Sequence, residues 1–353
     1  MVADILSGIS GAMCWPPVGH GRNREKDGAV LQQQSTQQAL SASPAASPVM
    51  HRGGINWLTT TVMVIYHVLA VVALFNFTWK GLALAVFLWW VSTSLGIGIG
   101  YHRLLTHRGF TTPKWLEYFL TVCGTLALEG GPIFWVGIHR IHHQLTDRPG
   151  DPHSPRDGKW WSHMGWVLTG EALHDGTEQL APYVPDLRRD RFYLWLSKYH
   201  WITQAVVGVA VMAAFGWKVT LWAVFLRTVV GLHGTWLVNS ATHLWGTQRW
   251  ATGDDSTNNF LIALLSWGEG WHNNHHAHPS SARHGLRWWE VDTNWYVIQC
   301  LHSVGLVKNI KLPRADSRIR EIGEAVPVAQ STEKPVAADP QAEMQPELIA
   351  AGN

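Results

Sequence analysis

The sequence predicts an all-α integral membrane protein that crosses the bilayer four times. Hydrophobic residues make up 46% of the 353 residues and charged residues only 15%, whereas about a quarter of a soluble domain is charged. The 22 tryptophans suit a chain with two membrane–water interfaces, where tryptophan is enriched. Long apolar segments also recur along the chain, and polar stretches separate them.

The first two apolar segments are residues 57–77 and 82–100, and Lys80 and Gly81 interrupt the apolar sequence between them. Each segment has roughly 20 residues, enough for a helix to cross the hydrocarbon core. The second ends in the repeat Gly96-Ile97-Gly98-Ile99-Gly100. Small residues allow helices to approach closely, so this repeat is explained equally well by packing and by a substrate channel.

Two more apolar segments, 201–215 and 219–238, complete the four predicted spans, and Gly216-Trp217-Lys218 forms the turn between them. A shorter apolar piece, 115–128, lies in the long polar region between the second and third spans. We predict that it is re-entrant or lies in the interface, because it is short for a span. Residues 130–132, Gly-Gly-Pro, end it.

Basic residues predict the orientation of these spans. Four spans place both termini and the region between spans two and three on one side of the membrane. The opposite side shows only Lys80 and Lys218. The first side holds eleven basic residues: Arg103, Arg108, Lys114, Arg140, Arg148, Arg156, Lys159, Arg188, Arg189, Arg191 and Lys198. The positive-inside rule therefore puts the termini and the large polar region in the cytoplasm.

The two ends of the chain have the composition of disordered tails. Residues 1–54 are rich in Gln, Ser, Ala and Pro, and residues 313–353 in Ala, Pro, Glu and Gln, so neither can bury a core. Residues 55–312 are then the single membrane domain. The net charge of +2 gives no indication of a nucleic-acid partner.

Histidine carries the chemical information. Three stretches are rich in it, and each follows an even-numbered span or the polar region behind one, so all of them share the predicted cytoplasmic side. The pattern H-x-x-H-H occurs twice, and on a helix its three rings fall within an arc of roughly 100°. The eight candidate metal ligands are His102, His107, His139, His142, His143, His272, His275 and His276.

Eight imidazoles are too many for one ion, and they suit two ions with four or five ligands each. A ninth candidate, His243, lies four residues after Asn239 at the end of the fourth span. The three cysteines are far apart in sequence, and histidine without cysteine suits iron, copper or zinc rather than an iron–sulfur cluster. Two irons can share the electrons that dioxygen reduction needs, and such chemistry can attack an unactivated methylene. We therefore expect an aliphatic chain dissolved in the bilayer as the substrate.

The histidines stand within longer motifs that resemble those of the membrane fatty acid desaturases of the acyl-CoA and acyl-lipid delta-9 type. The resemblance covers about residues 55–312. The motifs are HRLLTH at 102–107, GGPIFWV at 130–136 before HRIHH at 139–143, DPH at 151–153, WWSHMGW at 160–166, NSATH at 239–243, TGDDSTNN at 252–259, and GEGW at 268–271 before the last histidines.

This resemblance implies four transmembrane helices under a cytoplasmic cap with a diiron centre, and the nine histidines named above as its ligands. It gives Asn239 the position of a metal-bound water and assigns no catalytic side chain beyond the metal centre. It implies a dioxygen-dependent oxidoreductase that inserts a cis double bond, most often between carbons nine and ten. It also implies a separate electron donor, a ferredoxin or small cytochrome with its reductase, because no carrier domain is recognisable in the chain.

Several finer roles are hypotheses. Trp89, Trp90 and Ser94 precede the first histidine pair, and we expect a tryptophan there to close the acyl tunnel. Head-group contact is assigned to three basic residues beside the motifs: Arg140, Arg156 and Lys159. Two further histidines, His153 and His163, are candidates for orienting the ligands. His278 stands where the family usually has an aromatic residue.

Three alternatives stay open. A related histidine-box hydroxylase, ketolase or sterol-modifying enzyme would share the metal chemistry. A transition-metal transporter would need polar groups at the bilayer midplane, where His67 and His233 are the only obvious ones. The same two histidines could hold a haem, which would leave the histidine motifs unexplained. The sequence does not fix the acyl carrier, the double-bond position, the chain length, the donor, the metal or the oligomeric state.

Overall fold

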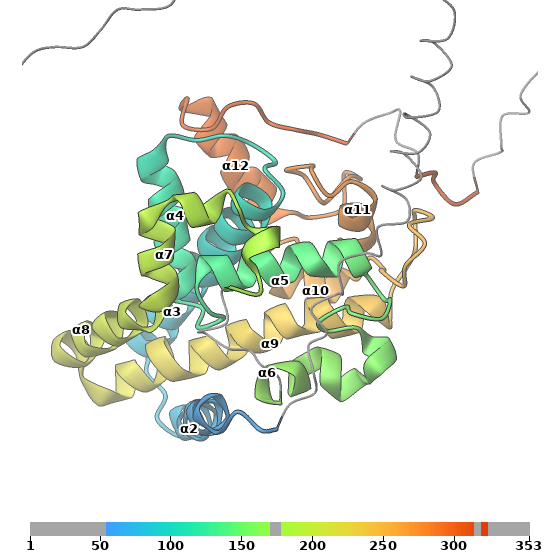
Figure 1. The fold of residues 1–353 in the computed structure, drawn as a ribbon. Coiled ribbons are helices and arrows are strands. Elements are labelled where there is room, and N and C mark those ends of the chain that lie inside the picture. Colours follow the sequence, from blue (N-terminus) through green and yellow to red (C-terminus); the bar gives the residue numbers. More distant parts are fainter. Residues whose placement is uncertain (1–53, 170–177, 314–318, 324–353) are drawn as a thin grey trace, which may run out of the picture. The chain divides into compact units, whose positions relative to one another are not determined.

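The computed structural model describes residues 54–169, 178–313 and 319–323. Within these ranges the chain forms helices joined by loops, and its only β-type pairing consists of isolated bridges. The helices are α2 (Trp57–Leu74), α3 (Trp79–Trp89), η1 (Trp90–Thr106), α4 (Lys114–Thr125), α5 (Pro132–Leu145), η2 (Pro155–Asp157), η3 (Trp161–Gly165), α6 (Trp166–Leu168), η4 (Ala181–Tyr183), η5 (Leu187–Arg189), α7 (Arg191–Lys198), α8 (His200–Thr220), η6 (Leu221–Leu226), α9 (Arg227–Ser240), η7 (Ala241–His243), α10 (Phe260–Leu265), α11 (His272–Ala277) and α12 (Thr293–Ser303). The all-helical prediction is confirmed for this part of the chain (Figure 1).

Three helices in the described residues are long and apolar enough to cross a membrane: Trp57–Leu74, Trp79–Thr106 and His200–His243. We predicted four spans, and the third of these helices covers both the third and the fourth predicted segment. Its continuity is broken at Gly216, whose φ of 76° is not helical. Glycine adopts this left-handed conformation without the steric cost that a Cβ brings.

Polar side chains cap the N-termini of the first two of these helices. The Asn56 side chain accepts a hydrogen bond from the Thr59 amide, and the Thr78 side chain accepts one from the Gly81 amide. Such N-caps satisfy amides that have no partner within the helix. The predicted break near Lys80 therefore coincides with a capped helix start.

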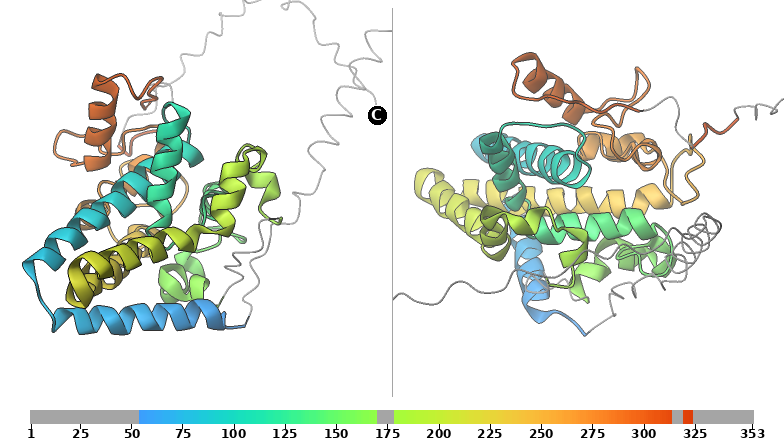
Figure 2. Two further views of the ribbon diagram at one scale, coloured as in Figure 1. Left: turned by 90° about the vertical axis from the view of Figure 1, so that its left-hand side faces the viewer. Right: turned by 45° about the horizontal axis from the view of Figure 1, so that its top comes forward.

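The long helices pack against one another through one side and expose the other. The α9 helix contacts α2, α3 and α10 (Figures 1 and 2). At the start of this helical run, Trp222 packs edge-on against Phe77, and its indole N–H donates to the Asn76 carbonyl. On the outer faces Phe75 is 82% exposed and Val209 70%. Apolar surface of this kind is stable in contact with lipid.

The glycine repeat in η1 is a packing feature. A Cβ on Gly96 would lie 2.3 Å from the Gly124 backbone nitrogen, and one on Gly100 would lie 2.9 Å from the Leu120 carbonyl oxygen. Both of these neighbours belong to α4, which therefore lies directly against η1. Of the two explanations for the repeat, close helix approach is the one that the structure supports.

The predicted tails, 1–54 and 313–353, lie outside the described residues except for 54, 313 and 319–323. The short piece 319–323 runs along residues 249–251. The Ala251 amide donates to the Arg320 carbonyl at 3.0 Å, and the Ile322 amide donates to the Arg249 carbonyl at 2.8 Å. This contact places the end of the described chain beside the third histidine motif.

Candidate metal centre

The nine predicted histidine ligands come together in two groups. Five of them form one group, in which each ring offers a nitrogen within 4.8 Å of the others: His102, His107, His139, His143 and His275. Four form a second group by the same criterion: His142, His243, His272 and His276. We call them the five-histidine group and the four-histidine group. The division matches the expected pair of ions with four or five ligands each.

The backbone of η1 explains why the rings of His102 and His107 lie close together. His102 and His107 are five residues apart, which on an α-helix would turn their side chains well away from each other. Here the His107 amide donates to the His102 carbonyl at 3.1 Å. This is the i→i+5 bond of a π-helix, and it closes one wider turn. The two rings lie 4.9 Å apart as a result.

The two H-x-x-H-H motifs each serve both groups. They lie on α5 and α11, which are helical as the pattern predicts. The neighbours His142 and His143 belong to different groups, and so do His275 and His276. Each helix therefore links the two groups through one peptide bond.

Contacts between ring nitrogens show that these groups fit cations. In the four-histidine group, the His243 Nδ1 and His276 Nδ1 atoms lie 2.9 Å from carboxylate oxygens and donate to them. Each neutral ring then holds a lone pair on Nε2. Both Nε2 atoms lie 3.0 Å from His272 Nε2. That atom has at most one hydrogen, so at least one of the two contacts joins two lone pairs and needs a cation to be stable.

The spacing suits a metal as well. In the five-histidine group the Nε2 atom of His143 lies 3.1 Å from that of His139 and 2.8 Å from that of His275. Neighbouring ligands at right angles around an ion, with metal–nitrogen bonds of about 2.1 Å, have nitrogens about 3.0 Å apart. The donor set is therefore pre-formed for two ions rather than assembled from distant side chains.

Burial favours the neutral form of three rings in the five-histidine group. It lowers the pKa of His139, His143 and His275 well below the ordinary histidine value, and neighbouring imidazoles lower it further. Removing a cationic ring from water is unfavourable, so these rings present lone pairs at neutral pH. A neutral imidazole is the form that binds a metal.

Four carboxylates orient the ligands, and the sequence analysis did not assign this role to them. The Nδ1 atom of one histidine lies against one carboxylate in each pair: His102 with Glu269 at 2.5 Å, His142 with Asp151 at 3.0 Å, His243 with Asp147 at 2.9 Å and His276 with Asp254 at 2.9 Å. Hydrogen bonds of this kind fix the ring orientation and tautomer and raise the basicity of the ligand. The only signal in the sequence is that these acids stand within or beside the motifs.

Glu269 also belongs to a buried ion-pair network. The fully buried Arg103 side chain donates to Glu269 at 2.8 Å and to Asp292 at 2.9 Å. Asn294 Nδ2 donates to the same Glu269 carboxylate at 2.7 Å, and Asn294 Oδ1 accepts a bond from Ser94 at 2.6 Å. Ser94, a predicted tunnel residue, therefore takes part in the support of a ligand.

Two further histidines lie close to the two groups. His153 and His284 are buried beside the groups, with rings 4.4 Å from His142 and 4.5 Å from His275 respectively. His153 is thus near a ligand as predicted, whereas the proximity of His284 was not anticipated. His278 packs edge-on against Trp250 and belongs to neither histidine group.

His163 lies apart from both groups, in a hydrogen-bonded row with the two span histidines. His163 Nε2 is 3.0 Å from His233 Nδ1, and His233 Nε2 is 3.1 Å from His67 Nε2. Two axial ligands of one haem iron would have nitrogens roughly 4 Å apart with a metal between them. The direct contact between His67 and His233 contradicts the haem alternative.

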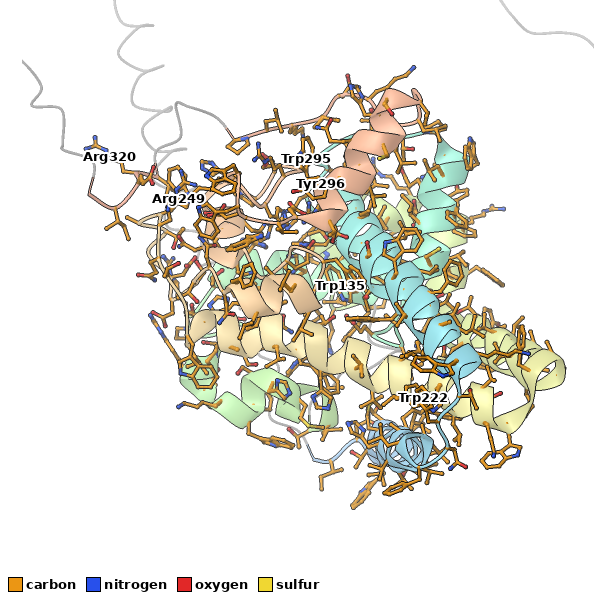
Figure 3. The ribbon with its side chains drawn as sticks, turned by 180° about the vertical axis from the view of Figure 1, so that it is seen from behind. Trp135, Trp222, Arg249, Trp295, Tyr296 and Arg320 are labelled. Atoms are coloured by element: carbon orange, nitrogen blue, oxygen red, sulfur yellow. The ribbon has the colours of Figure 1, made fainter. Side chains whose placement is uncertain are left out.

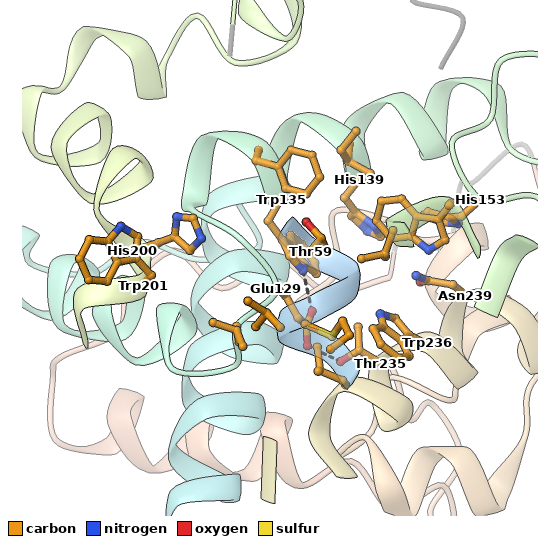
Figure 4. A pocket seen from close by; sticks show the side chains of 18 of the residues that line it. Thr59, Glu129, Trp135, His139, His153, His200, Trp201, Thr235, Trp236 and Asn239 are labelled. Atoms are coloured by element: carbon orange, nitrogen blue, oxygen red, sulfur yellow. Dashed lines mark hydrogen bonds between the residues drawn. The ribbon is translucent and has the colours of Figure 1, made fainter. Parts of the chain in front are cut away.

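A cavity of about 520 Å³ opens beside the histidine groups (Figure 4). Its walls are mostly apolar, and His139, His153 and Asn239 reach its surface. The residues that line it come from the helices α2, α5, α6, α7, α8 and α9 and from loops, and include Leu58, Met63, Leu128, Phe134, Leu232 and Trp236. Its size is that of a typical small-ligand site, and its lining suits a hydrocarbon chain.

One polar cluster interrupts this apolar wall. The Glu129 carboxylate accepts a hydrogen bond from Trp135 Nε1 at 2.9 Å and one from Thr235 at 2.8 Å, as the dashed lines in Figure 4 show. Burial raises the pKa of Glu129 to about 7, although both hydrogen bonds act in the opposite direction. The sequence analysis gave no role to Glu129.

A second, smaller cavity of about 40 Å³ continues toward η1. Trp89 and Thr93 line it together with His102, His139 and Asn239. Of the three predicted tunnel residues, only Trp89 lines a described cavity, because Trp90 and Ser94 are absent from both walls.

The three predicted head-group residues already have partners. Arg140 pairs with Asp186 at 2.8 Å and Arg156 with Asp255 at 2.7 Å. The Lys159 ammonium lies 5.6 Å from the Trp245 ring. A head group would therefore compete with these contacts.

Comparison with known proteins identifies the family. The fatty acid desaturase family model matches residues 77–301. The chain belongs to the fatty acid desaturase family. This membership and the apolar helices together indicate a membrane protein, and they favour a desaturase over the transporter alternative.

Several curated desaturases are similar over most of their length. The sn-1 stearoyl-lipid 9-desaturase of Anabaena variabilis is 48% identical over 73% of this chain and 94% of its own. The sn-2 palmitoyl-lipid 9-desaturase of Nostoc sp. (strain 36) is 43% identical over 72% and 90%. The icosanoyl-CoA 5-desaturase of Limnanthes douglasii is 44% identical over 71% of each. Members of the family thus differ in acyl carrier and in double-bond position.

Proposed function

We propose that this desaturase inserts a cis double bond at carbon nine of a saturated acyl chain carried by a membrane lipid. The lipid 9-desaturases among its relatives support this position and carrier. The observation that carries the proposal is the placement of His139 and Asn239 on the wall of an apolar cavity. A ligand of one metal group thus stands beside the space where a hydrocarbon chain would lie.

The balanced reaction uses dioxygen, two electrons and two protons for each double bond. Two adjacent methylenes each lose one hydrogen, and both oxygen atoms leave as water: R–CH₂–CH₂–R′ + O₂ + 2e⁻ + 2H⁺ → R–CH=CH–R′ + 2H₂O. The electrons come from a separate one-electron carrier, a ferredoxin or a small cytochrome with its reductase.

The two histidine groups would hold two Fe²⁺ ions. All nine residues offer imidazole nitrogens with no thiolate among them, and iron is one of the metals that such a set suits. When bound, the iron pair supplies the dioxygen activation that no side chain can perform. The amide of Asn239 would hold a water at the edge of the four-histidine group.

The protein's own residues supply position and a dry environment. The carboxylates of Asp147, Asp151, Asp254 and Glu269 hold the ligand rings in one orientation. The apolar cavity wall keeps water away from the acyl chain, which protects a reactive centre from side reactions. The acyl chain would pack against Trp135, whose indole N–H donates a hydrogen bond to Glu129.

The proposed membrane arrangement has four spans, because Gly216 divides the third long helix into two. Both termini and the metal centre would then face the cytoplasm, as the distribution of basic residues predicts. Head-group contact by Arg140, Arg156 or Lys159 and a tunnel closed by Trp89 are further parts of the proposal.

The test is the fatty-acid profile of a host that lacks its own desaturase, with and without this chain, and with His275→Ala as the control. Mass spectrometry would locate the double bonds and the lipid class that carries them first. We expect a 9-monounsaturated acid on a glycerolipid that vanishes in the variant. A hydroxylated product would favour the hydroxylase alternative. A product that appears first on coenzyme A would contradict the proposal that a membrane lipid carries the acyl chain.

A further inference from the structure

A basic surface rich in tryptophan covers the third histidine motif. It comes from three separate parts of the chain, which meet through the backbone pairing of residues 319–323 with 249–251 and through side-chain contacts to Glu321. We call it the Arg–Trp surface, and it consists of Arg249, Trp250, Arg287, Trp288, Trp289 and Arg320. Figure 3 shows Arg249 and Arg320 near each other, at the far end of the molecule from Trp222 of the membrane-spanning run.

The charge of this surface is positive. Arg249 and Arg287 share a single carboxylate, Glu321, at 2.9 and 3.3 Å. With Arg320 the surface carries three guanidinium groups against one acid. A positive surface attracts an acidic partner and speeds its encounter, an effect that salt weakens.

The exposure of Trp288 has no structural explanation among the described residues. Trp288 is 91% exposed, whereas Trp289 is 42% exposed and packs one edge against Trp271. A side chain of this size in water contributes nothing to the core, whereas tryptophan and arginine are the residues most often found at the energetic centre of protein interfaces. The surface lies outside the three helices that are long and apolar enough to cross a membrane, and its guanidinium groups favour an acidic protein as the partner that covers it.

Two short routes run from this surface to the metal ligands. The ring of Trp289 packs edge-on against the buried Trp271 at 5.6 Å, and Trp271 is covalently followed by His272. On the second route, Trp250 Nε1 donates to Asn274 Oδ1 at 3.0 Å, and Asn274 is covalently followed by His275. One route thus ends at each histidine group.

Backbone contacts hold the second route in place. The amides of Arg249 and Trp250 both donate to Asn273 Oδ1, at 2.8 and 2.7 Å. The Arg–Trp surface is therefore fixed to the ligand helix α11 rather than attached through a free loop. A carrier bound to this surface would be connected to the two histidine groups through the contact of Trp289 with Trp271 and the contact of Trp250 with Asn274.

We propose that the Arg–Trp surface is the docking site of an acidic one-electron carrier protein, which delivers the two electrons of each turnover in two successive bindings. The inference rests on the proposed function, since only a redox reaction requires the carrier. Arg287, Arg320 and Trp288 make the contact, and Trp271 and Trp250 lie between the carrier and the ligands.

Binding is the first test, because it does not depend on turnover. The full chain in lipid nanodiscs is titrated with an oxidised plant-type [2Fe–2S] ferredoxin in a calorimeter, at low and at physiological salt. The variant Arg287→Gln/Arg320→Gln is expected to raise the Kd about tenfold and to flatten its salt dependence, and Trp288→Ala to raise the Kd about fivefold. The matched control Arg189→Gln/Arg191→Gln removes the same charge from two exposed residues beside α7 and should leave the Kd unchanged.

Turnover is the second test. The KM for reduced ferredoxin should rise in the Arg287→Gln/Arg320→Gln variant while kcat at saturating ferredoxin is kept. An unchanged Kd and KM in both surface variants, with a working wild-type enzyme, would overturn the docking proposal alone. A wild-type enzyme that binds ferredoxin through this surface but forms no double bond would instead count against the proposed function.

Discussion

The Nε2 atoms of His143 and His275 lie 2.8 Å apart although 132 residues separate them in the chain. One belongs to the second histidine motif and the other to the third, and both are in the five-histidine group. Two uncharged ring nitrogens this close are stable when one ring donates its N–H to the other, or when a metal ion binds both nitrogens. The contact is therefore the most direct place to test the metal centre.

Replacing His275 with alanine should remove the ion of the five-histidine group. We expect the bound iron to fall by about half or more and the desaturated product to disappear, since the ligand lies at the centre of its group. Metal analysis of the purified protein measures this. The control His278→Ala removes a buried histidine three residues away that lies outside both groups. Equal iron in His275→Ala and wild type would contradict the assignment.

Asp151→Asn should weaken the four-histidine group without removing a ligand. Asp151 accepts bonds from His142 and from the backbone amides of Asp147 and His153. Loss of a carboxylate that orients a ligand costs about 10–100-fold in metal affinity. Competition with a chelator measures that affinity, and the control is Asp186→Asn, because Asp186 pairs with Arg108 and Arg140 rather than with a histidine. An equal effect of both changes would show that the role of Asp151 is not specific.

Arg103→Gln should destabilise the protein more than a surface arginine change does. It would leave the carboxylates of Glu269 and Asp292 buried without their cation, and breaking a buried ion pair costs about 3–5 kcal/mol. The thermal midpoint in detergent should fall, whereas that of Arg191→Gln should stay within a degree or two. A midpoint equal to wild type would mean that water reaches these carboxylates.

The effect of Glu129→Gln on the stability of the folded protein should become more favourable as the pH rises. Because burial raises the pKa of Glu129 to about 7, the folded state holds a proton that the unfolded chain loses above about pH 4.3. The stability of the wild type at this site therefore falls between about pH 4.3 and 7. The difference in thermal midpoint between Glu129→Gln and wild type should grow in favour of the variant from pH 5 to 8. A difference in thermal midpoint that does not change with pH would mean that the pKa of Glu129 is not raised in the folded protein.

Trp89→Ala should lengthen the acyl chains that the enzyme accepts. Trp89 lines the smaller cavity and packs against Trp267 at 4.8 Å, so its removal extends the space for the methyl end. The neighbouring Trp90→Ala is a matched control, since Trp90 lines neither cavity. Product chain lengths from fed fatty acids measure the effect. Identical profiles for both variants would leave no role for Trp89 in chain length.

The sequence predicted which histidines come together better than it predicted their surroundings. Two H-x-x-H-H motifs have a spacing that only a helix turns into one face, so periodicity was enough to find them. His243 became a candidate through its place at the end of the fourth predicted span, four residues after Asn239, and the resemblance added it to the expected ligands. The carboxylates such as Asp147 and Glu269 could not be assigned, since an acid that orients a ring looks the same in sequence as an acid on the surface.

The backbone was harder to predict where it departs from regular helices. The π-type turn that joins His102 and His107 depends on packing against neighbouring helices, which no local pattern records. The turn between the third and fourth predicted segments was easier, because Gly216 breaks the helix there with a φ of 76°. The pairing of residues 319–323 with 249–251 is a long-range contact inside a stretch whose composition resembles a tail.

The histidine dipeptides at 142–143 and 275–276 have a consequence for how the enzyme can change. Each dipeptide sends one ring to each group, and consecutive Cα atoms are separated by about 3.8 Å whatever the surrounding sequence. The spacing of the two histidine groups is thus tied twice to covalent geometry, in addition to the packing of the helices. Substitutions in the cavity walls can therefore change the shape of the cavity while the spacing of the two groups stays constant. The same histidine groups can in this way stand beside cavities of different shape.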